Sequence, residues 1–188
     1  AVNSYGTTMT DCKLSWTTDG YKKDIQMYGD SYFGMRTVDR WAYYLAKDGY
    51  AEHILMDGYA GRASNTAITS LTNNLKHSNP KFIIWCMGMN DGSDTSATEP
   101  SQQWSYNRDK VINLCGEYIE PIFATIPTVP TINHEGKNNW IRNSGYRYID
   151  FAKAVGADEN GNWYDGMLSS DGVHPTEKGA KALYIRVL

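Results

Sequence analysis

Near the middle of this chain lies the apolar stretch Phe82-Ile83-Ile84-Trp85-Cys86-Met87, followed directly by Gly88-Met89-Asn90-Asp91. The apolar run is far too short to cross a bilayer. Continuous apolar runs of this length are typical of strands that are covered on both faces, as in parallel sheets. The stretch therefore predicts a buried parallel strand that ends in a polar loop.

Strand-like and helix-like segments alternate on both sides of this stretch. The sequence predicts strands at residues 24–28, 53–56, 82–87, 121–126 and 146–151. The expected helical faces are Val38, Trp41, Ala42 and Leu45; Ala67, Ile68, Leu71 and Leu75; Trp104, Val111, Cys115 and Tyr118; Ala180, Leu183, Tyr184 and Val187. This alternation predicts a flavodoxin-like, three-layer α/β/α sandwich with a central parallel sheet.

Polar motifs follow three of the predicted strands, and a fourth lies near the end of the chain. They are Gly29-Asp30-Ser31, Tyr59-Ala60-Gly61, Gly88-Met89-Asn90 and Asp171-Gly172-Val173-His174. Ligands bind at the carboxyl ends of the strands in open α/β sheets, so the first three motifs are expected at one edge. A helix that starts just after Ser31 would direct its N–H groups to the same place.

These residue types suit nucleophilic catalysis. A serine hydroxyl such as that of Ser31 needs an imidazole to take its proton, and the imidazole needs a carboxylate to fix its tautomer. His174 and Asp171 provide those two groups. A backbone N–H at Gly61 and the side-chain amide of Asn90 are donors suited to a developing oxyanion.

The four motifs occur in the order found in SGNH hydrolases, also called the GDSL esterase/lipase family, and the chain resembles that family from about residue 25 to residue 175. The resemblance implies that Ser31 attacks an ester carbonyl and that His174 is general base and then general acid. It implies that Asp171 orients His174, and that the oxyanion lies among the Ser31 N–H, the Gly61 N–H and the Asn90 amide. No metal or organic cofactor is required.

The chain departs from the family pattern at two positions. Tyr32 follows the serine where leucine is frequent, and Arg62 follows Gly61 where a small polar or acidic residue is frequent. Gly58 lies in the same loop and remains an alternative donor to Gly61. The Gly-x-Ser-x-Gly elbow of α/β-hydrolases is not matched, because Phe33 occupies its last glycine position.

Length and charge limit the organisation and the partners. The 188 residues suit one hydrolase domain at residues 25–188, with residues 1–24 as an N-terminal extension or strap. A formal net charge of -3 gives no bulk attraction to nucleic acid or an anionic membrane, and no membrane insertion is expected. Cys12, Cys86 and Cys115 cannot all pair with one another and do not form a zinc ligand set.

Several weaker signals concern the compartment, metal binding and the remaining histidines. The chain begins at Ala1 without a signal peptide, which favours the mature form of a secreted or periplasmic protein, with an excised fragment as the alternative. A calcium loop is suggested by the spacing of Asp158, Asn160 and Asn162, but Trp163 and Ser169 replace its glycine and glutamate. The remaining histidines are expected on the surface or in strands: His53, His77 and His134, the last being the first alternative base.

The substrate is expected to be a small-molecule or glycan ester. Trp140, Trp163 and Tyr164 lie in segments that resemble loops, where flat rings stack on sugars, and the bulky Tyr32 and Phe33 beside Ser31 favour a small acyl group such as acetyl. The sequence thus predicts an O-acetyl esterase acting on a carbohydrate, with Tyr32, Trp140 and Trp163 as substrate contacts. A general short-chain lipase or thioesterase and a non-catalytic glycan-binding module remain alternatives.

Overall fold

The computed structural model describes residues 23–34 and 36–188, which contain one five-stranded parallel sheet with the order β2-β1-β3-β4-β5. Its strands are β1 (Ile25–Gly29), β2 (Ile54–Gly58), β3 (Phe82–Cys86), β4 (Glu120–Ala124) and β5 (Tyr148–Ile149). The apolar stretch that defines the sequence pattern is the central strand β3. The predicted α/β fold with a parallel sheet is confirmed.

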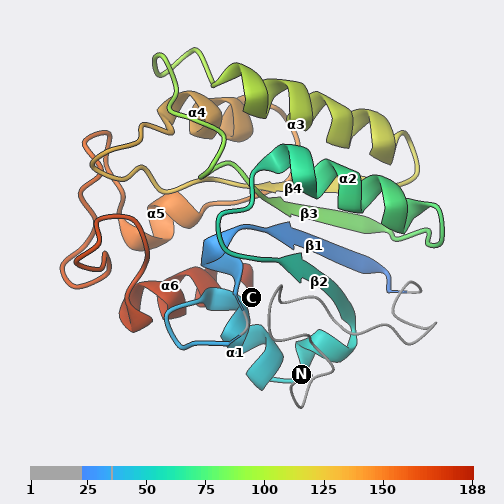
Figure 1. Ribbon diagram of the computed structural model, residues 1–188, viewed down its shortest axis with the longest axis horizontal. Helices are drawn as coiled ribbons and strands as arrows, with labels where there is room; N and C mark the ends of the chain where they lie inside the picture. The colour runs from blue at the N-terminus through green and yellow to red at the C-terminus, as the bar shows by residue number, and fades with distance from the viewer. Residues whose placement is uncertain (1–22, 35) are drawn as a thin grey trace.

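Helices cover both faces of the sheet (Figure 1). One layer contains α2 (Ser64–Leu75), α3 (Gln102–Cys115) and α4 (Glu135–Asn143). The other contains α1 (Trp41–Lys47), α5 (Phe151–Val155) and α6 (Glu177–Val187). Short 3-10 turns, η2 (Ser31–Phe33) and η3 (Tyr50–Glu52), follow β1 and precede β2. Because all neighbouring strands are parallel, the carboxyl ends of all five strands lie along the same edge of the sheet.

Large aromatic side chains fill the two layers between sheet and helices. Trp41, Trp85, Trp104 and Phe123 are each 0–1% exposed. Burial of such rings is the largest apolar contribution that single side chains make to stability. The core therefore holds the strand ends rigidly against the helices.

Among the predicted elements that end earlier than expected, two have a cause that the structure shows. The last strand was expected at residues 146–151, but it covers only Tyr148–Ile149, because the Asp150 carboxylate caps α5 by accepting from the Lys153 N–H at 3.2 Å. Tyr118 was expected on a helical face, but α3 ends at Cys115, where Gly116 has a φ of 56°. Tyr118 is instead 89% exposed.

Three further expectations concern the extension, the membrane and the cysteines. The expected strap at residues 1–24 lies almost entirely outside the described residues. Among the helices of the described ranges, none has the length and apolar character needed to cross a bilayer. Cys86 and Cys115 are buried and free, as expected for a strand residue and a helix-face residue.

Candidate active site

Ser31 begins the single 3-10 turn η2, directly after β1. Asp30 caps this turn, because its carboxylate accepts from the Tyr32 N–H at 3.1 Å and its carbonyl accepts from the Phe33 N–H at 3.1 Å. The helix expected just after Ser31 is only this turn, since α1 begins at Trp41. Ser31 is buried, with 7% of its surface exposed.

The structure brings Ser31 together with His174 and Asp171, which lie in the loop before α6. The Ser31 Oγ is 3.0 Å from the His174 Nε2, and the His174 Nδ1 is 2.8 Å from the Asp171 Oδ2. An ionised carboxylate only accepts hydrogen bonds, so it selects the tautomer with the proton on Nδ1. That leaves Nε2 free to accept the serine proton.

The other carboxylate oxygen of Asp171 is held by three donors. The Ser169 hydroxyl donates to it at 2.6 Å, and the N–H groups of Val173 and His174 donate at 2.8 and 2.9 Å. These hydrogen bonds, with that of Ser169 the strongest, hold the pKa of Asp171 well below its usual range. Ser169 was missed in the sequence; its only signal is a serine placed two residues before an aspartate, a spacing suited to local turns.

Tyr32 ties the nucleophile turn to the histidine loop. Its hydroxyl donates to the Val173 carbonyl, and its ring lies 6.0 Å from that of His174 and 6.2 Å from that of Trp163. Burial raises the pKa of the Tyr32 hydroxyl, so it stays a neutral donor. Trp163 is itself fixed by donation from its Nε1 to the Thr128 carbonyl at 2.8 Å. Tyr32 therefore borders the histidine, and Trp163 packs against Tyr32.

Asn90 follows β3 and is exposed, and its side-chain Nδ2 donates to the Arg62 carbonyl at 3.0 Å. Gly61 is also exposed and has a φ of 71°, a conformation that favours glycine. Gly58, in contrast, ends β2, and a Cβ there would lie 2.3 Å from the Phe33 ring. Packing against Phe33 therefore explains Gly58 as a structural glycine.

Asp91 joins the Asn90 loop to the neighbouring helices. Its carboxylate accepts from the Ser64 N–H at 2.8 Å and from the Gln103 side-chain amide at 3.0 Å. Asp30 and Asp91 are thus hydrogen-bond acceptors within their loops.

Phe33 and Trp140 both pack against other aromatic rings of the core. Phe33 is fully buried against Trp41, with ring centroids 4.9 Å apart, and so it does not border the reacting group. Trp140 was expected in a loop but lies on α4. Its ring packs with those of Trp104, Phe123 and Tyr146, and the Arg108 guanidinium lies 4.2 Å from its centroid. This packing accounts for Trp140, which we do not retain as a substrate contact.

His134 was expected at the surface or in a strand, but this prediction is wrong. The residue is fully buried where α4 begins. Its Nδ1 lies 3.2 Å from the Lys137 Nζ and its Nε2 lies 3.3 Å from the Met89 Sδ. Burial, together with the Lys137 charge, lowers the pKa of His134 to about 3. It therefore has no access to substrate as an alternative base, and His53 and His77 are exposed elsewhere.

The suggested calcium loop forms a turn that its own side chains satisfy. The Asp158 carboxylate accepts from the N–H groups of Asn160 and Asn162 and from the Asn162 amide, at 2.8–2.9 Å. In residues 23–34 and 36–188, no group of three or more His, Cys, Asp or Glu side chains is placed to hold a metal ion.

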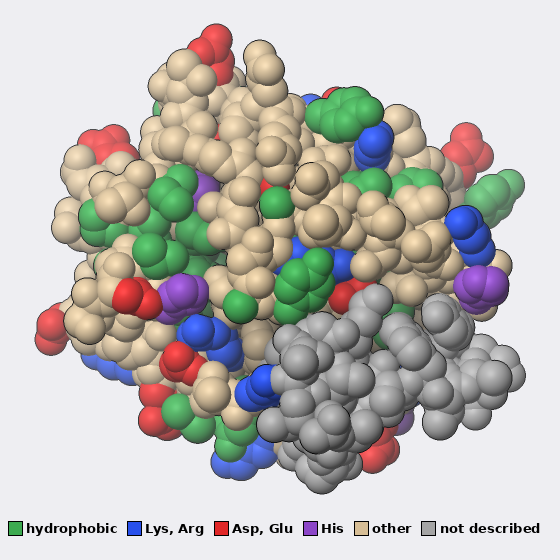
Figure 2. Space-filling model, in the orientation of Figure 1, with side chains coloured by type: hydrophobic (Ala, Val, Ile, Leu, Met, Phe, Trp, Pro, Cys, Tyr) green, Lys and Arg blue, Asp and Glu red, His purple; other side chains and the backbone are tan. Residues whose placement is uncertain are grey.

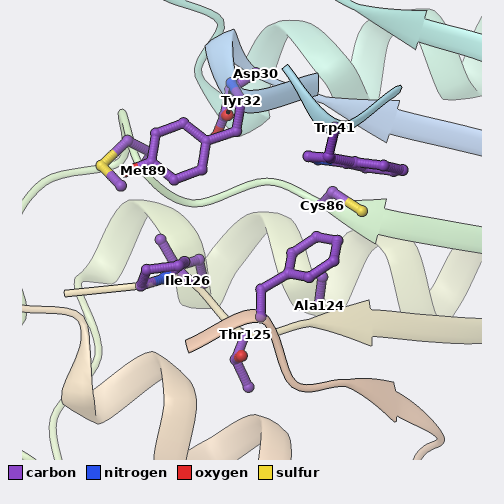
Figure 3. A pocket seen from close by; sticks show the side chains of 10 residues that line it. Asp30, Tyr32, Trp41, Cys86, Met89, Ala124, Thr125 and Ile126 are labelled. Atoms are coloured by element: carbon purple, nitrogen blue, oxygen red, sulfur yellow. Dashed lines mark hydrogen bonds between the residues drawn. The ribbon is translucent and has the colours of Figure 1, made fainter. Parts of the chain in front are cut away.

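A small cavity lies at the carboxyl ends of β1, β3 and β4 (Figure 3). Its volume is about 20 Å³, and its lining includes Asp30, Tyr32, Met89 and Ile126. Burial raises the pKa of the Asp30 carboxyl in its wall to about 7. On the left of the space-filling view, where the strands of Figure 1 end, hydrophobic side chains gather beside a histidine and an acidic side chain (Figure 2).

Comparison with known proteins shows which family and which solved structures this chain is similar to. The chain matches the GDSL-like Lipase/Acylhydrolase family over residues 17–182. A search of curated proteins found no match. Similar folds occur in solved structures, and at identities below a fifth these matches establish the fold alone.

Three of these structures illustrate the similarity. TesA is 19% identical, with a TM-score of 0.63 over 87% of this chain and 94% of its own. A lipase/acylhydrolase from Enterococcus faecalis is 17% identical, with a TM-score of 0.64 over 88% and 93%. The psychrotrophic esterase EstA from Pseudoalteromonas sp., in a structure inhibited by monoethylphosphonate, is 15% identical, with a TM-score of 0.59 over 87% and 93%.

Proposed function

Because the chain belongs to the GDSL-like lipase/acylhydrolase family and is therefore a carboxylic ester hydrolase, we propose that Ser31 is its nucleophile, His174 its base and Asp171 the residue that orients the base. The observation that carries this proposal is the continuous hydrogen-bonded path from the Ser31 Oγ through both nitrogens of His174 to Asp171, with steps of 3.0 and 2.8 Å.

The reaction follows from this geometry. As the Ser31 Oγ attacks the ester carbonyl, its proton passes to the His174 Nε2, and the ionised Asp171 stabilises the imidazolium that forms. The same proton then goes to the leaving alcohol. Water, deprotonated by His174, releases the acid from the acyl-enzyme and restores the serine.

Donors around the attacked carbonyl stabilise the oxyanion. The N–H groups of Ser31 and Gly61 and the side-chain amide of Asn90 are the proposed donors. Gly61 is favoured over Gly58 because it is exposed, whereas packing against Phe33 explains Gly58. Each donor is fixed by the backbone or by a hydrogen bond, so little reorganisation is needed when the charge develops.

The acyl group is proposed to be short, with acetyl the best fit. The bulky Tyr32 directly follows the nucleophile, and its side chain is held beside it by the Val173 carbonyl and the Trp163 ring. A carbohydrate alcohol is supported by Trp163, which is partly exposed beside Tyr32, and by the exposed Tyr164 that follows it.

Hydrolysis of p-nitrophenyl acetate, butyrate and octanoate tests the proposal, with Ser31→Ala as the matched control. Wild type should prefer acetate, and Ser31→Ala should lower kcat by a factor on the order of 10⁴ or more while the protein stays folded. Full acetate hydrolysis by purified Ser31→Ala would refute the nucleophile assignment. Preference for octanoate would refute the short acyl group and favour the lipase or thioesterase alternative, whereas an inactive wild type would favour a binding module.

A second experiment tests the carbohydrate. Trp163→Ala should impair acetate release from an acetylated oligosaccharide by roughly tenfold more than hydrolysis of p-nitrophenyl acetate, because binding energy from remote contacts is lost only with the larger substrate. Equal losses on both substrates would make Trp163 a packing residue for Tyr32 and the histidine loop.

A further inference from the structure

A buried ion pair anchors the loop between β2 and α2. The Arg62 guanidinium donates to both oxygens of the Asp57 carboxylate, at 3.0 and 3.3 Å, and to the Asp57 carbonyl at 2.7 Å. Neither side chain is exposed to solvent. Since Asp57 belongs to β2, the arginine fixes its own loop to the carboxyl end of this edge strand.

This pair is poorly explained by stability alone. Burial of two charges costs desolvation energy that their attraction only partly offsets. The Arg62 Nε is also buried without a hydrogen-bond partner in the described structure, which adds to the cost. Tyr59 and Tyr28 pack around the guanidinium, with ring centroids 4.9 and 5.9 Å away, and so restrict its movement.

The backbone of Arg62 lies between two of the proposed oxyanion donors. Gly61 directly precedes it, and the Arg62 N–H donates to the Tyr59 carbonyl at 3.4 Å, which closes the turn that contains Gly61. The Arg62 carbonyl accepts one hydrogen of the Asn90 amide at 3.0 Å. A side-chain amide has two N–H groups, so this contact fixes the orientation of the second, which remains available to the oxyanion.

We infer that Arg62 is a positioning residue for the oxyanion hole: its ion pair with Asp57 holds the Gly61 N–H and, through its carbonyl, the Asn90 amide in place. The inference rests on the proposed function. The inference gives a role to Arg62, which occupies one of the two positions where this chain departs from the pattern of its family.

The main test is Arg62→Met, which keeps much of the side-chain length and removes the hydrogen bonds. It should lower kcat for p-nitrophenyl acetate by roughly 10–100-fold, because small displacements of catalytic donors have effects of this size. The KM should change by less than about threefold, because the oxyanion exists only in the transition state. Arg62→Lys keeps the charge and should recover part of the loss.

A double-mutant cycle separates positioning from general destabilisation. Asn90→Ala alone should lower kcat by roughly 10²–10³. If Arg62 acts in part through Asn90, Arg62→Met should cause a defect at least about threefold smaller in the Asn90→Ala background than in wild type. The control is Arg142→Met. It breaks the ion pair with Asp150, which follows β5 at the opposite end of the strand order from β2, and it should keep wild-type kcat.

Unchanged kcat in folded Arg62→Met, or strictly additive losses in the cycle, would overturn the inference. If Arg62→Met does not fold, Arg62→Lys and the neutral double variant Asp57→Asn/Arg62→Gln take its place in the same cycle, with the same deciding outcomes. Failure of the proposed function is recognised separately, because it requires Ser31→Ala to retain activity whatever the Arg62 variants do.

Discussion

Asp171 is the most heavily hydrogen-bonded side chain of the candidate triad, since it accepts from the Ser169 hydroxyl, from the backbone N–H groups of Val173 and His174, and from the His174 Nδ1. The carboxylate is exposed, and yet it is fixed in one orientation by its own loop. At the scale of single residues, the orientation of His174 is therefore set locally and does not depend on deep burial.

This arrangement predicts different effects for the two ends of the motif. His174→Ala should lower kcat about as much as Ser31→Ala, because the serine then has no base. Asp171→Asn keeps the shape but presents an amide that favours the wrong tautomer, and should lower kcat by up to roughly 10⁴. Both are measured as kcat against pH. Near wild-type activity of His174→Ala would remove His174 as the base.

The three residues of η2 show what one turn does with neighbouring side chains. A 3-10 helix has three residues per turn, so successive side chains point in three different directions. Ser31 contacts His174, Tyr32 contacts Val173 and Trp163, and Phe33 enters the core beside Trp41. From the sequence, Tyr32 and Phe33 were both expected beside the substrate. The 3-10 turn that points their side chains in different directions could not be recognised from the sequence.

At the scale of elements, α4 was missed because its buried face is largely polar. Its buried residues are Gly136, Lys137, Asn138 and Ile141. The Lys137 Nζ donates to the Asp94 carboxylate at 2.6 Å and to the Gly92 carbonyl at 2.7 Å, and the Asn138 amide bonds both polar groups of the Ile126 backbone. Ile141 is the one large apolar residue among these buried residues, so α4 lacks the series of spaced apolar residues from which the other helices were predicted.

The position of Trp140 on this helix predicts a structural role. Trp140→Ala should lower the free energy of unfolding by roughly 3 kcal/mol, because it removes a partly buried ring from the cluster with Trp104 and Phe123. Its kcat/KM on both p-nitrophenyl acetate and an acetylated oligosaccharide should remain at the wild-type value. Urea denaturation and the two assays measure these effects, and a loss confined to the oligosaccharide would return Trp140 to the substrate site.

At the scale of the whole molecule, two features were predictable from the sequence: the parallel sheet, and the position of the polar motifs at one edge of it. Ordered motifs after alternating strands converge because parallel strands share one carboxyl edge. The anchors of these motifs were not predictable, since the Arg62–Asp57 and Lys137–Asp94 pairs depend on which polar side chains become buried. A sequence pattern reports apolar faces and turn residues, and buried charges leave no comparable signal.

A buried acid also makes the stability of the molecule depend on pH. Burial raises the pKa of Asp30 from 3.8 to about 7, so between these values the folded state binds more protons than the unfolded state, and stability falls as pH rises. Asp30→Asn retains an acceptor for the Tyr32 N–H and removes this loss. Relative to wild type, it should gain stability from pH 4 to pH 8 by an amount on the order of 4 kcal/mol. Urea denaturation of both proteins across that range is the measurement, and a difference that does not vary with pH would contradict the shift.

The contact between Ser31 and His174 joins residues 143 positions apart in the chain. During synthesis, the nucleophile turn and the sheet strands leave the ribosome long before the histidine loop does. On the proposed assignment of His174 as the base, a nascent chain that has not yet released this residue holds a serine without a base, and it is expected to be inactive on esters. On the same assignment, hydrolysis is expected to begin only once the loop before α6 has docked, so its onset would report the docking of that loop.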